Sequence, residues 1–144
     1  MKTTKLILLL AFTALFANCG KPECESQEPG NILSLEERVQ AAVAWNDFKN
    51  AADDNLNATQ NEIDALRGKI YLATARDKVK IRRIINKNEY QLDKLRKSLY
   101  DHDVWFEKNI NTYSDKNAEK IDAFKNDFQA KLNDINAEID DCNC

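Results

Sequence analysis

Glycine and proline, which most often end regular secondary structure, are scarce in this chain. Its 144 residues include three glycines and two prolines, and after Gly30 there is no proline and one glycine, Gly68. Proline removes a backbone donor, and glycine costs about 1 kcal/mol inside a helix. Little therefore interrupts long helices, and we expect an all-α protein.

Residues in catalytic patterns are also missing. The chain has one histidine and no glycine-rich phosphate loop, HExxH or CxxC motif. Its carboxylates are scattered over expected helix surfaces, where they solvate the fold. We therefore expect no enzyme, no cofactor and no resident metal. The formal net charge of −3 also argues against a general nucleic-acid binder.

The clearest feature present is an apolar stripe in the last third of the chain. Between Val104 and Cys142 apolar residues recur in steps of three and four, which is typical of an amphipathic helix. A helix with one apolar side must pack against others. The stripe comprises Phe106, Ile110, Tyr113, Ile121, Phe124, Phe128, Leu132, Ile135 and Ile139.

Polar runs predict where the helices begin and break. Ser34-Leu35-Glu36-Glu37 is a capping box. Asp53-Asp54-Asn55 and Tyr100-Asp101-His102-Asp103 are the most polar interruptions, with Asp103 as an N-cap. We predict helices over 34–52, 57–100 and 104–141, with the last two forming a long hairpin.

Two other breaks remain open. A break at Gly68 would give three helices of nearly equal length, and one at Thr74 to Asp77 would give four helices. Three equal helices would place the chain ends about 50 Å apart. The strap from Cys24 to Leu33 reaches only about 33 Å. If the ends are joined by disulfides, the earlier break is favoured.

The first residues predict export. Lys2 and Lys5 precede an apolar run from Leu6 to Ala17, which is shorter than the about 20 residues that span a bilayer. We expect a signal peptide over 1–17, a cysteine-bearing strap over 18–33 and a helical domain over 34–144. Cleavage after Ala17 would give a secreted, extracellular protein.

A second processing route competes with plain secretion. Phe16-Ala17-Asn18-Cys19 can be interpreted as a lipobox, with a lipid on Cys19 holding a bacterial lipoprotein at a membrane. Only Ala17 fits that pattern well, and cysteine parity favours secretion. In the secreted form we expect no membrane association.

Four cysteines lie at the two ends of the chain, at positions 19, 24, 142 and 144. In an oxidising compartment we expect Cys19, Cys24, Cys142 and Cys144 to form two disulfides that clasp the termini of the bundle. The pairing is open, although a Cys142–Cys144 bridge would be strained. Metal binding by the four thiols is a weaker alternative.

A basic stretch is the main candidate for binding. From Arg76 to Lys97 there are nine Lys or Arg residues against three acids. Four of them line one helical face because they are spaced by four, three and four residues. This basic stripe, which could dock an acidic protein, a sulfated polysaccharide or a lipid headgroup, consists of Arg76, Lys80, Arg83 and Lys87. The alternative is a solvated face that pairs with acids of the final helix.

Three smaller features have less specific interpretations. Asp101-His102-Asp103 could supply metal ligands, but a helix turn is favoured. Asn57-Ala58-Thr59 is an N-glycosylation sequon, meaningful only in a eukaryotic source. The aromatic residues are expected in the core and in helix-turn packing: Trp45, Phe48, Trp105 and Phe106.

The layout of export segment, cysteine-bearing strap, proline-free helical body and cysteine-rich tail resembles that of small secreted helical proteins from the saliva of blood-feeding arthropods, the anophensin and albicin group. That resemblance rests on the four terminal cysteines and on body length. It implies an inhibitor that binds plasma proteins of contact activation or complement, with the basic stripe and His102 as places to look. A self-associating coiled coil is a third hypothesis, testable by sedimentation.

Overall fold

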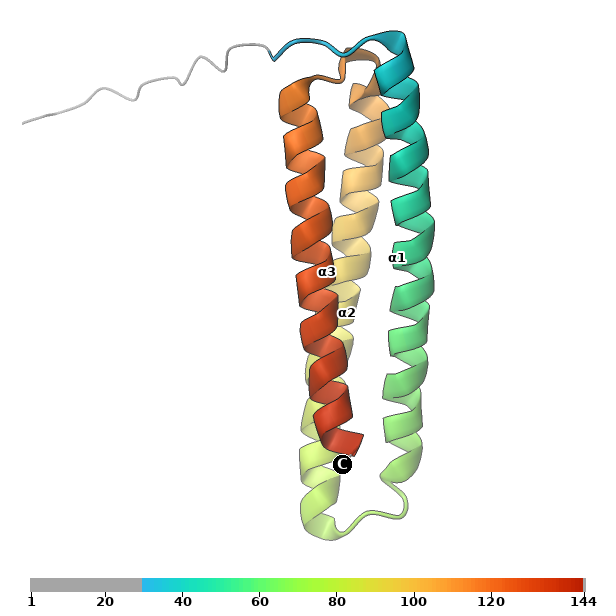
Figure 1. Cartoon of the computed structure of the whole chain (residues 1–144). Helices are drawn as coiled ribbons and strands as arrows, with labels where there is room; N and C mark the ends of the chain where they lie inside the picture. The colour runs from blue at the N-terminus through green and yellow to red at the C-terminus, as the bar shows by residue number, and fades with distance from the viewer. Residues whose placement is uncertain (1–29, 144) are drawn as a thin grey trace, which may run out of the picture.

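Three long helices form a bundle in the computed structural model, which describes residues 30–143 (Figure 1). Helix α1 spans Leu35–Lys69, α2 spans Ala75–Asn109 and α3 spans Asp115–Asn143, with a short 3-10 turn, η1, at Ile110–Thr112. Helices α1 and α3 run in one direction and α2 runs in the opposite direction. The prediction of an all-α helical bundle is confirmed.

The first helix begins where its capping box predicts. The Ser34 hydroxyl accepts a hydrogen bond from the Glu37 backbone N–H at 3.3 Å, and the Glu37 carboxylate accepts one from the Ser34 N–H at 2.9 Å. These two bonds satisfy donors that have no partner inside the helix. The Ser34 hydroxyl also donates a hydrogen bond to the Glu37 carboxylate at 2.7 Å, and this bond, followed by the one from the Ser34 N–H, lowers the pKa of Glu37.

The apolar stripe predicted for the end of the chain is part of the core, but the predicted single helix over 104–141 is wrong. Phe106 lies in α2, Ile110 lies in η1, and the stripe from Ile121 onward lies in α3. All of its residues are buried except Ile110, which is half-buried. The α1 side of the core is supplied by Trp45, Ala52, Leu56, Ile63 and Leu66. The α2 side is supplied by Ile81, Ile85, Leu92, Leu95 and Leu99, together with Phe106.

An aromatic group closes the end of the core near η1. Trp45 stacks on Phe106 with 5.3 Å between ring centroids, and Phe106 meets Tyr113 edge-to-face at 5.3 Å. Phe48 and Trp105 are half-buried and pack against the same core, so the core interpretation of the four aromatics is confirmed. Burial raises the pKa of Tyr113 to about 12, with a smaller contribution from the negative charge of Asp122.

The predicted helix break after residue 52 is wrong. The polar run from Asp53 to Asn55 is exposed on the outside of α1, while Ala52 and Leu56 on either side are buried. A helix needs only one apolar face, so three polar residues on the other face do not end it. The chain turns instead just after Gly68, at the alternative break, and Thr74 then caps α2.

The second predicted break, at residues 100–103, is also wrong. Asp103 is not an N-cap but an interior residue of α2 that faces α1. Its carboxylate accepts a hydrogen bond from the Trp45 indole at 2.8 Å and pairs with the Lys49 Nζ at 3.0 Å. These partners lie more than 50 positions away in the sequence, so local polarity gave no sign of them. The helix ends at Asn109.

The segment before α1 is tied to the start of α3. Ile32 and Ser114 form an isolated antiparallel bridge, and the Leu33 N–H donates to the Tyr113 carbonyl at 2.9 Å. Gly30 lies so close to this corner that a Cβ atom there would meet the Ser114 side chain at 3.2 Å. The start of the described chain is thereby fixed at the end of the bundle that holds η1 (Figure 1).

The described part of the chain does not test the disulfide clasp. Cys19, Cys24 and Cys144 lie outside the described residues, and Cys142 is half-buried and forms no disulfide with another described residue. The disulfide clasp therefore stays a prediction.

One polar residue lies in the apolar core of α2 without a partner. Core positions of α2 follow a regular four-three spacing from Ile81 to Phe106, and Asn88 occupies one of them. Asn88 is fully buried, and among the described residues neither its Oδ1 nor its Nδ2 atom finds a hydrogen-bond partner. A buried amide of this kind costs stability.

Another buried polar group is satisfied. The Thr59 hydroxyl donates to Asn136 Oδ1 at 2.8 Å and links α1 to α3. Within residues 30–143, none of the helices has both the length and the apolar character needed to cross a bilayer.

Candidate binding surface at the hairpin end

The turn between α1 and α2 points two of its side chains outward. Ile70 and Ala73 are half-buried and pack against the core, and short-range bonds from Leu72 N–H to Lys69 O and from Ala73 N–H to Ile70 O fix the turn. Because residues 70 and 73 turn inward, the two residues between them cannot. Tyr71 is 83% exposed and Leu72 is 95% exposed.

This turn lies at the far end of the molecule. Figure 1 shows that α1 and α2 continue beyond the last turn of α3, so the α1–α2 turn has no third helix beside it. Large exposed apolar side chains at such a position make no contribution to the core. Val79, one turn into α2, adds a third exposed apolar side chain at 68%.

Helix α2 begins with a side-chain cap. The Thr74 hydroxyl accepts a hydrogen bond from the Asp77 backbone N–H at 3.3 Å and donates one to the Asp77 carboxylate at 2.6 Å. The acid nearest to the turn on α2 is therefore engaged in the cap. Both residues belong to the alternative break that the sequence left open.

The predicted basic stripe lies on the outside of α2. Arg76, Lys80, Arg83 and Lys87 are all exposed. They occupy the helix face roughly opposite Ile81 and Ile85, which are buried. The structure therefore brings the four together on one open face, as their spacing predicts.

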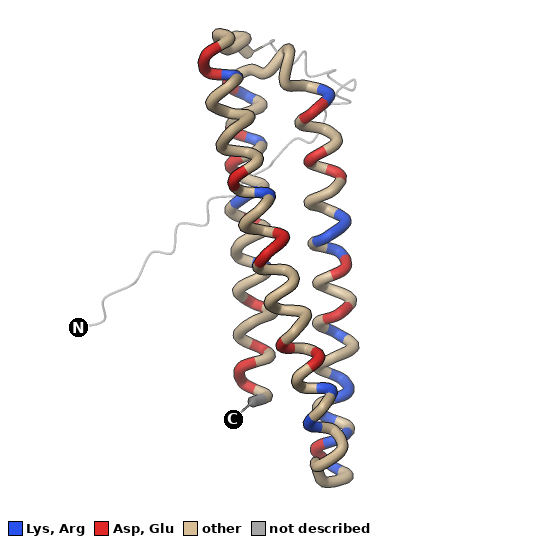
Figure 2. Tube along the Cα trace, turned by 90° about the vertical axis from the view of Figure 1, so that its right-hand side faces the viewer, with Lys and Arg blue, Asp and Glu red and all other residues tan. Residues whose placement is uncertain are grey.

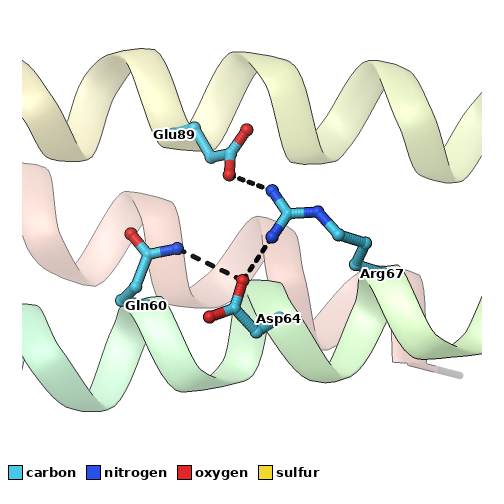
Figure 3. Close-up of polar contacts among 4 residues, drawn as sticks. All are labelled: Gln60, Asp64, Arg67 and Glu89. Carbon is cyan, nitrogen blue, oxygen red and sulfur yellow. Dashed lines mark hydrogen bonds and ion pairs between the residues drawn. The ribbon is translucent and has the colours of Figure 1, made fainter.

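Pairing divides the cations of this region into two groups. Lys87 belongs to the paired group, with its Nζ 2.8 Å from the Glu138 carboxylate of α3. Arg67 pairs with Asp64 of α1 and with Glu89 of α2, and Gln60 donates to the same Asp64 oxygen (Figure 3). The predicted alternative of a stripe paired with α3 therefore applies to Lys87.

The second group lies nearer to the α1–α2 turn than Lys87 does. Within residues 30–143, its five cations form no ion pair, hydrogen bond or cation–π contact through their side chains with another described residue. They are Arg76, Lys78, Lys80, Arg82 and Arg83. Together with Tyr71, Leu72 and Val79 they make up what we call the basic tip, visible as the concentration of blue at the lower end of the tube in Figure 2.

A second surface, which the sequence did not suggest, is a pair of adjoining grooves between α2 and α3. One, of about 410 Å³, is lined by Tyr90, Leu95, Phe128 and Ile135, among others. The other, of about 630 Å³, lies around His102 and Trp105. Phe124 lines both grooves. Because these residues come from two helices far apart in sequence, no local pattern indicates either groove.

The Asp101-His102-Asp103 cluster does not converge on one point. His102 stacks on Phe124 with 3.7 Å between ring centroids, and its Nδ1 lies 2.8 Å from the Ser98 carbonyl. Asp101 pairs with Lys97, while Asp103 faces α1. Across the part of the chain that the structure describes, no three His, Cys, Asp or Glu side chains are grouped to hold a metal ion.

The predicted glycosylation sequon lies inside α1. Asn57 is exposed, and its Oδ1 accepts a long hydrogen bond from Arg96 at 3.4 Å. Thr59, the third residue of the sequon, is buried and bonded to Asn136. A transferase would therefore have to act before the bundle folds.

Comparisons of the chain with protein-family models, with curated proteins and with solved structures each found no match. The resemblance to salivary proteins stays a prediction. Any assignment of function depends on the surfaces described above.

Proposed function

We propose that this protein is a non-catalytic binding protein that contacts a negatively charged partner through its basic tip. The observation that carries the proposal is the contrast in pairing along the hairpin. Arg67 and Lys87 are neutralised by nearby acids, whereas the five cations beyond them have no described partner.

Clustered cations at one end create a local positive potential even though the whole chain is acidic. Even exposed cations that form ion pairs add little to stability. The tip cations form no ion pair with a described residue, so they are not needed to hold the bundle together. The proposal also includes action outside the cell, which the predicted export segment suggests. The salivary resemblance suggests plasma proteins of contact activation or complement as partners to screen.

The absence of catalysis belongs to the proposal as well. What supports it is the engagement of the single histidine, His102, in stacking on Phe124 and in a contact with a backbone carbonyl. The rival hypothesis of a lipoprotein anchored through Cys19 concerns a residue outside the described chain and stays a prediction.

Heparin affinity chromatography tests the proposal with a matched pair of triple variants. Arg76→Glu, Lys80→Glu and Arg83→Glu together should lower the salt concentration at which the protein elutes, because they reverse three of the five unpaired charges. The control variant, Lys97→Glu, Lys108→Glu and Lys120→Glu, makes the same change of net charge at exposed positions away from the tip.

Both triple variants should keep the wild-type circular dichroism because the substituted side chains are exposed. Elution of the tip variant together with the wild type would show that the tip does not bind heparin. Equal loss of retention in the control would show that retention reflects net charge and not the tip.

A further inference from the structure

The basic tip combines exposed apolar side chains with five unpaired cations, of which Lys78 is half-buried and the other four are exposed. Tyr71 and Leu72 are adjacent, almost fully exposed and held outward by a turn whose other residues are anchored in the core. The five unpaired cations follow within the first nine residues of α2, or about 12 Å of helix axis. The apolar pair is thus at the extreme end, and the charges lie just behind it.

We propose that the basic tip docks on an anionic phospholipid bilayer, with Tyr71 and Leu72 entering the interface and the cations contacting lipid headgroups. This inference rests on the proposed function and names its partner. Tyrosine is favoured at the membrane interface because its ring is apolar and its hydroxyl stays hydrated. The headgroup region of one leaflet is roughly 5–8 Å thick. From Arg76 to Arg83 the cations span about 11 Å along the helix axis, which is more than this thickness, and their long side chains reach toward the headgroups while the turn lies deeper.

The arrangement of the charges around α2 favours a bilayer over an acidic protein. Arg76, Lys80 and Arg83 share the outer face, but Lys78 and Arg82 lie between a third and a half of a turn away around the helix. A partner protein docked along one face would meet the first three alone. A surface that crosses the end of the hairpin comes close to all five.

The shape of the apolar tip points the same way. The Leu72 side chain protrudes from the turn and is almost fully exposed, so a protein partner would have to offer a pocket that fits it. A bilayer accepts a small protruding apolar group without one. The cations supply the attraction to anionic lipid that a single short apolar contact lacks, as in other proteins that bind membranes at the interface.

Vesicle co-sedimentation tests the inference on the full mature chain, with phosphatidylcholine vesicles that contain or lack phosphatidylserine. The wild type should bind only the vesicles that contain phosphatidylserine. High salt should weaken this binding because charges are screened within about 3 Å at 1 M. The double variant Tyr71→Ser and Leu72→Ser should bind at least about tenfold more weakly. The triple reversal of Arg76, Lys80 and Arg83 to Glu should weaken binding by at least about a hundredfold, because it removes three attractive charges and adds three repulsive ones.

A matched control replaces exposed apolar residues at the other end of the rod. Leu35→Ser and Val39→Ser remove side chains that are 70% and 56% exposed, and they should leave vesicle binding unchanged. All variants change exposed side chains, so each should retain the wild-type helix content and melting temperature. In the variant Leu72→Trp, brominated lipid should in addition quench the tryptophan fluorescence.

The outcomes separate this inference from the proposed function. If the double variant Tyr71→Ser and Leu72→Ser loses vesicle binding but keeps heparin binding, the bilayer is the partner. If the wild type binds heparin but not anionic vesicles, or the serine pair binds vesicles as the wild type does, the inference is overturned and an acidic protein or polysaccharide takes its place. If the wild type binds neither, both proposals fail.

Discussion

Replacing the buried Asn88 is predicted to stabilise the protein, although most substitutions in a protein core destabilise it. Asn88→Leu should stabilise it. Asparagine and leucine both branch at Cγ and have the same number of side-chain heavy atoms, so leucine fits the space with little strain. The substitution removes a buried amide that has no partner among the described residues. It also continues the apolar four-three pattern of α2.

The size of the effect can be worked from the structure. Leaving a buried polar group unsatisfied costs about 1–3 kcal/mol, and leucine adds a few tenths of a kcal/mol through its better helix propensity. We expect the free energy of unfolding to rise by about 1.5–3.5 kcal/mol. For a domain of this length that corresponds to an increase in Tm of roughly 6–14 °C.

Urea unfolding followed by far-UV circular dichroism measures this change. The midpoint should move to higher urea with an unchanged slope, since the surface exposed on unfolding is nearly the same. Asn136→Leu is the matched control. Asn136 accepts the hydrogen bond of the buried Thr59 hydroxyl at 2.8 Å, so the same substitution there should destabilise the bundle by about 1–2 kcal/mol. If Asn88→Leu leaves stability unchanged or lowers it, the Asn88 amide is satisfied in solution and the reasoning is wrong.

Two further predictions concern the aromatic end of the core. Asp103→Ala should lower the free energy of unfolding, measured in urea, by about 1–3 kcal/mol, because it leaves the buried Trp45 indole N–H without its acceptor. Asp103→Asn keeps a carbonyl oxygen and should lower the free energy of unfolding by less. Equal losses of stability in the two variants would contradict this role of Asp103. Tyr113 has a pKa raised by burial from 10.0 to about 12, so its contribution to stability is complete below pH 10 and is lost as the pH rises toward 12. Tyr113→Phe should remove the last step of a tyrosinate absorbance titration and make unfolding less dependent on pH between 10 and 12; an unchanged titration curve would count against the assignment.

Local sequence patterns were sufficient for the class of fold, the start of the first helix and most of the core. Ser34 and Glu37 cap α1 through bonds that involve only neighbouring residues. The part of the apolar stripe from Ile121 to Ile139 is buried because its period matches that of helix α3, whatever the helix packs against. The same periodicity placed Arg76, Lys80 and Arg83 on one exposed face.

The positions of the turns were not determined in this way. Both signals for the turn between α1 and α2 are present in the sequence, in Gly68 and in the cap formed by Thr74 and Asp77. The polar run at residues 53–55 looked stronger, and the assumed clasp of the termini favoured it. A polar run on the outer face costs a helix almost nothing, so polarity alone cannot locate a break.

Tertiary structure decided which polar residues acquire partners and which side chains stay exposed. Asp103 meets Trp45 and Thr59 meets Asn136 across 58 and 77 residues of sequence, and Asn88 meets no described partner. Tyr71 and Leu72 have apolar side chains of the kind expected in a core. They are exposed to solvent because Ile70 and Ala73 occupy the two positions of the turn that face the core. The sequence by itself determined the periodic faces of the helices, which depend on neighbours three and four residues apart. Only the packing of three helices determined the turns, the long-range bonds and the exposed tip, because these depend on residues that are distant in sequence.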